Sequence, residues 1–110
     1  MINKDRMIRN FLDLVQIDSL SRKEGALASK LRADLQALGL EVRVDNAAKA
    51  VGGETGNLIA RLPGDPAIPP FLLSAHMDTV GPGEGIRPMV ERDRIATAGR
   101  TILGGDCKSG

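Results

Sequence analysis

The fold class of this chain is decided by one stretch of its sequence, Phe71-Leu72-Leu73-Ser74-Ala75-His76-Met77-Asp78-Thr79-Val80. Residues 71–75 are too continuously apolar for a sheet edge, which predicts a fully buried strand. Side chains of a strand alternate between faces, so we expect His76 and Asp78 to share one face at its end. A neutral imidazole binds zinc well, and best when its second nitrogen donates to a carboxylate. The stretch therefore predicts that His76 is a metal ligand and that Asp78 orients it.

The second informative feature is the C-terminal stretch Thr101-Ile102-Leu103-Gly104-Gly105-Asp106-Cys107-Lys108-Ser109-Gly110. Its glycine pair allows a tight backbone path that could bring Asp106 into a site. A carboxylate is a hard oxygen ligand that binds one metal ion or bridges two. The spacing of a phosphate-binding loop is absent, so we do not interpret this stretch as a nucleotide site. Taken singly, His76 could be structural, and Asp78 and Asp106 could be turn acids.

The rest of the sequence predicts helices and strands throughout residues 1–110, with no internal domain boundary. Apolar residues recur at helical spacing in residues 4–16 and again up to about Leu38. The second helix follows a plausible capping box, Ser21 to Glu24, and precedes Gly39, which suits a left-handed helix end. We expect strands at 40–44 and 58–62, a loop at 46–56, and a hairpin of 87–90 with 94–97.

The composition excludes several classes of protein. Fifteen basic and fourteen acidic residues leave a formal charge of +1, and there is no Trp or Tyr, so neither nucleic acid nor an anionic membrane is expected as a partner. A single cysteine excludes an internal disulfide and fits a reducing compartment. The first residues lack the apolar core of a signal peptide, and no apolar run reaches the roughly twenty residues of a membrane span. These features predict a cytoplasmic protein.

Both informative stretches, together with Gly56-Asn57-Leu58-Ile59-Ala60 and the helical start, resemble the zinc-dependent exopeptidase family. This family includes peptidase T, carboxypeptidase G and acetylornithine deacetylase, and the chain is most similar to its peptidase T-like branch. The resemblance implies an α/β fold with helices packed on a mixed sheet. It also implies that His76 binds one zinc ion, that Asp78 orients the imidazole as a catalytic residue, and that Asp106 bridges two zinc ions.

The resemblance also implies a function. The complete enzyme would be a di-zinc aminopeptidase that hydrolyses the N-terminal peptide bond of short peptides, and a homodimer is left open. A deacetylase or carboxypeptidase of the same family is the alternative, because all share these ligands. Enzymes of this family are much longer than this chain, which therefore resembles the N-terminal part of a catalytic domain.

Two positions depart from the family's pattern. Cys107 stands where the peptidase T-like branch usually has a second Asp, and Ala98 stands where an acid often precedes the glycine. We expect neither to be a metal ligand. The further ligands and the general base have no counterpart in this chain, so the isolated chain is expected to be inactive, and a non-catalytic fragment or interaction module is the competing interpretation. We also expect the segment that carries Asp106 to be poorly anchored, as chain termini usually are.

Overall fold

The computed structural model describes residues 1–110 and confirms the α/β class. The elements, in chain order, are α1 (Lys4–Val15), α2 (Gly25–Ala37), β1 (Glu41–Val44), α3 (Ala48–Val51), β2 (Leu58–Arg61), β3 (Arg87–Val90), β4 (Ile95–Ala98) and α4 (Gly105–Lys108). No helix combines the length and the apolar character that crossing a bilayer requires. The first helix, the two early strands and the late hairpin lie where the sequence predicts them, whereas α3 occupies part of the predicted loop at 46–56.

The four strands form two separate antiparallel pairs instead of one mixed sheet. In the first pair, β1 and β2 place Val42 opposite Ala60. In the second, β3 and β4 form the predicted hairpin, with Val90 opposite Ile95 beside the turn. Parallel pairing is limited to one isolated bridge, between Leu20 and Thr79.

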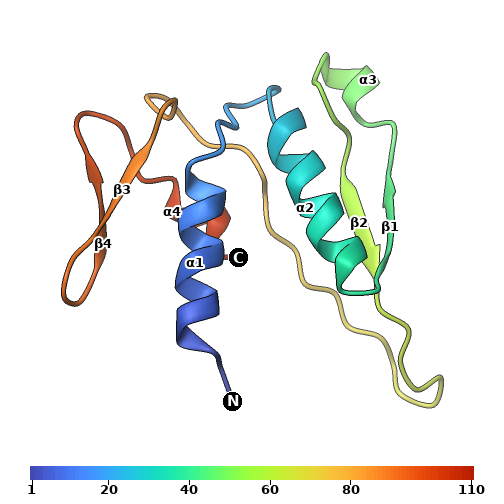
Figure 1. Cartoon of the computed structure of the whole chain (residues 1–110). Helices are drawn as coiled ribbons and strands as arrows, with labels where there is room; N and C mark the ends of the chain where they lie inside the picture. The colour runs from blue at the N-terminus through green and yellow to red at the C-terminus, as the bar shows by residue number, and fades with distance from the viewer.

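The elements gather into two groups that leave the molecule open. Helix α2 packs on β1 and β2, and α1 packs on α4. Figure 1 shows the extended segment 71–78 running between these groups. The radius of gyration is 15.4 Å, whereas a compact domain of this length has about 13 Å. The apolar core is accordingly small, and consists of Val15, Leu27, Ala28, Ile86 and Cys107.

The prediction of a buried strand at residues 71–75 is wrong for this structure. The segment is extended but unpaired, and the side chains of Phe71, Leu72 and Leu73 are 84–87% exposed. A groove of about 860 Å³ separates it from α2 and β2, and its lining includes Leu58, Leu72 and Leu73. A buried strand needs a hydrogen-bonded neighbour and an apolar cover. No element of these 110 residues lies close enough to supply either.

The predicted capping box before α2 is also wrong. Glu24 occupies the N-cap position without a side-chain cap, and its Oε1 accepts from the backbone N–H of Arg22 at 2.8 Å. The Ser21 hydroxyl instead donates to the carboxylate of Asp78. A charged acceptor forms a stronger hydrogen bond than a neutral one, which explains the preference. At the other end of α2, Gly39 has φ +84°, the left-handed conformation that the sequence predicts.

The segment that carries Asp106 is anchored, contrary to the expectation from its place in the chain. Gly104 turns the backbone with φ +73° into the single turn of α4. Gly105 lies against the aromatic ring of Phe11, where an added Cβ would be 3.5 Å from the ring. Cys107 and Lys108 are buried behind it. Packing on α1 therefore fixes the start of α4, on which Asp106 lies.

Candidate metal centre

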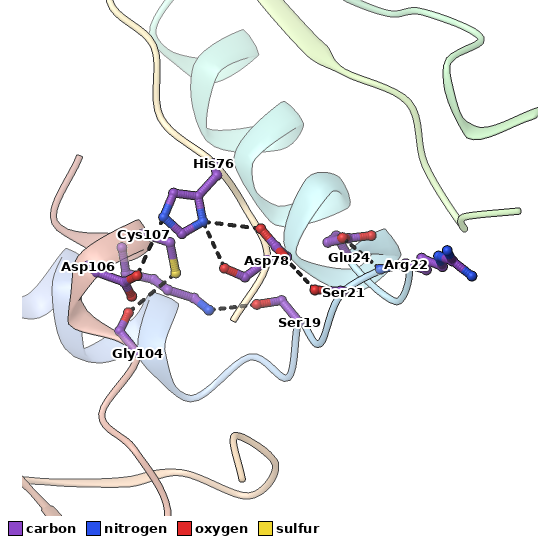
Figure 2. Close-up of polar contacts among 10 residues, drawn as sticks. Ser19, Ser21, Arg22, Glu24, His76, Asp78, Gly104, Asp106 and Cys107 are labelled. Carbon is purple, nitrogen blue, oxygen red and sulfur yellow. Dashed lines mark hydrogen bonds and ion pairs between the residues drawn. The ribbon is translucent and has the colours of Figure 1, made fainter. Parts of the chain in front are cut away.

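The imidazole of His76 is held from one side by Asp78. The Nδ1 atom of His76 lies 2.9 Å from the backbone oxygen of Asp78 and 3.1 Å from its Oδ1 (Figure 2). Both neighbours are acceptors, so Nδ1 carries the proton. In the neutral ring, Nε2 is then the atom with a free lone pair, and this is the tautomer that a metal ligand requires.

The free nitrogen of His76 faces the second acid that the sequence singles out. Asp106 lies in the first turn of α4, and its Oδ2 is 3.5 Å from His76 Nε2 (Figure 2). Both side chains are solvent-accessible, with 54% and 74% of their surfaces exposed. The structure thus brings together His76, Asp78 and Asp106, although 28 positions of sequence separate the second from the third.

The spacing of these atoms fits a zinc ion. Two atoms that each bind a tetrahedral zinc at about 2.0–2.1 Å lie about 3.4 Å apart, and the measured separation of Nε2 and Oδ2 is 3.5 Å. A lone pair and a carboxylate that point at each other repel unless a proton or a metal cation lies between them. The imidazole and carboxylate are also ligand types that zinc accepts.

Two converging ligand groups do not complete a metal site. No group of three or more His, Cys, Asp or Glu side chains in the chain could hold a metal ion. Zinc sites generally use three or four protein ligands. Residues 1–110 therefore supply one half of a candidate site.

Cys107 does not join His76 and Asp106 in a group of metal ligands. Its side chain is buried, with 5% of its surface exposed, and Sγ donates to the backbone oxygen of Gly104 at 3.4 Å. In this position the thiol behaves as a small buried apolar residue. Ala98 lies on β4, in the hairpin, and offers no ligand atom.

The charge state of Asp78 is set by its neighbours. The hydroxyl of Ser21, and next the imidazole of His76, hold the pKa of the Asp78 carboxyl below its ordinary value, while partial burial opposes them. Each carboxylate oxygen has its own partner, because Ser21 donates to Oδ2 and His76 to Oδ1. The carboxylate is therefore ionised and fixed in orientation.

Two residues beside the half-site, Ser19 and Ser21, had no role in the sequence-based predictions of the site. Ser21 contacts Asp78, and the ammonium of Lys108 donates to the hydroxyl of Ser19 at 2.6 Å. The two pairs are separated by 57 and 89 positions of sequence. A serine three residues before a glutamate is typical of a helix cap. Nothing in the sequence near Ser21 therefore indicated its contact with the distant Asp78.

Comparison with known proteins finds similarity in sequence and in fold. No family model matches the chain. The uncharacterized protein YqjE of Bacillus subtilis strain 168 is 40% identical over 110 residues, which are 100% of this chain and 30% of YqjE. This chain thus spans less than a third of the length of that relative.

Two solved structures are similar to the chain in both sequence and fold. The aminopeptidase PepT from Bacillus cereus ATCC 10987 has a TM-score of 0.93 and 38% identity, over 97% of this chain and 29% of that one. A tripeptidase from Staphylococcus aureus has a TM-score of 0.92 and 40% identity, over 98% of this chain and 29% of that one. Residues 1–110 therefore share the fold of one part of these peptidases.

Proposed function

We propose that this chain is part of a zinc-dependent aminopeptidase similar to peptidase T, which hydrolyses the N-terminal peptide bond of short peptides. The observation that carries the proposal is the 3.5 Å separation of His76 Nε2 and Asp106 Oδ2, with the imidazole tautomer fixed by Asp78. The similarity to an aminopeptidase and a tripeptidase, at 38% and 40% identity, supports this class of substrate.

Each of the three residues has a distinct role in this proposal. His76 offers Nε2 as a ligand, and Asp106 offers a carboxylate that could bind one zinc ion or bridge two. Asp78 holds the proton on Nδ1, which keeps Nε2 free and makes the imidazole a stronger donor to the metal. Zinc bound there would polarise the carbonyl of the scissile bond and activate water as the nucleophile. The remaining ligands and the general base would come from polypeptide beyond these 110 residues.

The proposed place of action is the cytoplasm. The single cysteine is free and buried, which is usual for proteins of reducing compartments. The proposed substrates, short peptides, are consistent with that location.

A chimaera tests the proposed function. Residues 1–110 would replace the matching 29% of Bacillus cereus PepT, and the product would be assayed for tripeptide hydrolysis and zinc content. We expect zinc-dependent turnover that His76→Ala or Asp106→Ala reduces by at least about 100-fold, because each removes a proposed ligand. Asp93→Ala, an exposed acid in the β3–β4 turn, is the matched control and should have no effect.

Two results would contradict the proposal. One is a folded chimaera with no turnover beside an active PepT. The other is a chimaera whose turnover and zinc content survive the loss of His76.

A further inference from the structure

One short segment contacts both arms of the candidate metal centre. The first arm is the segment that carries His76 and Asp78, and the second is helix α4, which carries Asp106. Residues 19–21, which we call the strap, lie in the connection between α1 and α2. The backbone N–H of Thr79 donates to the backbone oxygen of Ser19 at 2.8 Å, and Leu20 forms the parallel bridge with Thr79. The strap therefore runs beside the end of the segment that carries His76 and Asp78.

The first arm is held through Ser21. Its hydroxyl donates to Oδ2 of Asp78, and Oδ1 of the same carboxylate accepts from His76 Nδ1 (Figure 2). Rotation of the carboxylate would break both bonds together. Ser21 thus fixes the orientation of the group that selects the tautomer of His76.

The second arm is held through Ser19. This residue is fully buried, and its hydroxyl accepts from Nζ of Lys108, whose surface is only 8% exposed. Lys108 forms no ion pair within 4.0 Å, so the hydroxyl is its one polar partner in the chain. Burying an ammonium group is unfavourable unless specific contacts compensate. Lys108 lies two residues after Asp106 in the single turn of α4, so this contact ties the helix to the strap.

The two arms also meet at Thr79. Its methyl group lies 3.1 Å from the position that a Cβ would take on Gly104, immediately before α4. Its hydroxyl is buried without a hydrogen-bond partner. The next residue after the strap, Arg22, has φ +72°, a conformation that a non-glycine residue keeps only where its surroundings determine it. The strap is therefore held in one conformation.

These contacts matter because the proposed ligands do not position themselves. The side chains of His76 and Asp106 are more than half exposed, and neither packs in a core that would fix the distance between them. We propose that the strap is the positioning element of the metal centre, with Ser21 acting through Asp78 on His76 and Ser19 acting through Lys108 on Asp106. The inference rests on the proposed function, since it assigns the spacing of the two ligands to residues that touch neither.

The chain suits a direct test, because His76 is its only histidine. The ¹⁵N shifts of one imidazole ring report the tautomer of the metal-free chain, measured at about pH 8.5, roughly two units above the ordinary histidine pKa. Zinc chloride is then titrated into the same samples, and the shift of Nε2 gives the apparent affinity. Variants are Ser21→Ala, Ser21→Thr, Ser19→Ala and Lys108→Met, with Ser29→Ala as a control on the exposed surface of α2.

The two arms predict different results. Ser21→Ala should lower both the population protonated at Nδ1 and the zinc affinity, the latter by about 10-fold. Ser21→Thr keeps the hydroxyl and should restore both. Lys108→Met should lower the zinc affinity by a similar factor with the tautomer unchanged, and so should Ser19→Ala. Backbone amide spectra and thermal melts identify any variant that has lost its fold, and Lys108→Met then decides the second arm if Ser19→Ala does not fold.

Three results would overturn the positioning role. They are an unchanged tautomer in folded Ser21→Ala, a failure of Ser21→Thr to restore it, and an unchanged zinc affinity in folded Lys108→Met. A folded chimaera with PepT whose turnover and zinc content survive His76→Ala would contradict the metal proposal instead, so the two failures are distinguishable.

Discussion

His76 Nδ1 makes two contacts with one residue, the backbone oxygen of Asp78 at 2.9 Å and its Oδ1 at 3.1 Å. The backbone contact survives any substitution of Asp78. Removal of the carboxylate should therefore weaken the preference for the Nδ1-protonated tautomer without abolishing it.

The first prediction concerns Asp78→Ala. We expect zinc affinity and chimaera turnover to fall by about 10-fold, at the lower end of the usual effect of residues that orient a ligand. The loss of the Ser21 hydrogen bond should cost only about 1 kcal/mol of stability. Zinc titration and thermal melts on the same samples separate the two effects. A variant with full activity, or one whose lost activity follows its unfolding, would contradict the orienting role.

Features that depend on neighbouring residues can be predicted from this sequence, whereas features that depend on distant residues cannot. Helix α1 and the β3–β4 hairpin follow from spacing and turn residues within a few positions, and both were predicted. The predicted strand at 71–75 failed because a strand also requires partners, which cannot be read from the strand's own residues. Similarly, the approach of His76 to Asp106 could be predicted only from the resemblance to a known family. The contact of Ser21 with Asp78 had no signal in the neighbouring sequence.

The second prediction concerns Gly56→Ala. A Cβ at Gly56 would lie 2.2 Å from the backbone oxygen of Asp45, a distance that real Cβ atoms do not adopt. The β1–β2 pair must therefore shift, and we expect a destabilisation of about 1–3 kcal/mol. Gly64→Ala is the control, because its added Cβ would meet nothing within 4 Å. Equal melting temperatures of the two variants would show that the connection between the strands tolerates the shift.

The third prediction concerns the acid sensitivity of the same connection. The side chain of Asn57, followed by the backbone N–H groups of Ala47 and Asn57, holds the pKa of Asp45 below its ordinary value of 3.8. The folded state therefore favours the ionised carboxylate. Its contribution to stability is present above pH 3.8 and is lost as the pH falls through the lower pKa of the folded state.

Melting temperatures at pH 7 and at about pH 2.5 check this prediction. Asp45→Asn should lower the melting temperature at neutral pH and reduce the difference between the two conditions. Asp93→Asn, which changes an exposed acid in the β3–β4 turn, should leave that difference as in the wild type. If Asp45→Asn loses as much melting temperature at low pH as the wild type does, a group other than Asp45 causes the acid sensitivity.

The fourth prediction concerns the exposed apolar segment. Phe71, Leu72 and Leu73 present 84–87% of their surfaces to solvent on a backbone without a paired strand. Unpaired, apolar extended segments promote association between chains. The double substitution Phe71→Ser with Leu73→Ser should reduce self-association in analytical ultracentrifugation, with stability changed by less than about 0.5 kcal/mol. Leu38→Ser removes a single exposed leucine from the end of α2 and should have little effect. Association that persists in the double variant would place the contact elsewhere.

The last prediction is that residues 1–110 alone do not hydrolyse peptides. Two ligand groups converge on the candidate site, and no third His, Cys, Asp or Glu joins them. A zinc ion held by only two protein ligands dissociates readily, and water fills its remaining coordination positions. Such an ion does not hold a substrate in a fixed orientation. The purified chain with added zinc should therefore cleave a tripeptide no faster than zinc alone, and His76→Ala should make no difference. The chimaera with PepT, assayed in parallel, is the positive control and should cleave the same tripeptide. Zinc-dependent cleavage by the isolated chain, abolished by His76→Ala, would mean that these residues assemble a complete site in solution, with ligands brought together by a rearrangement of the open fold.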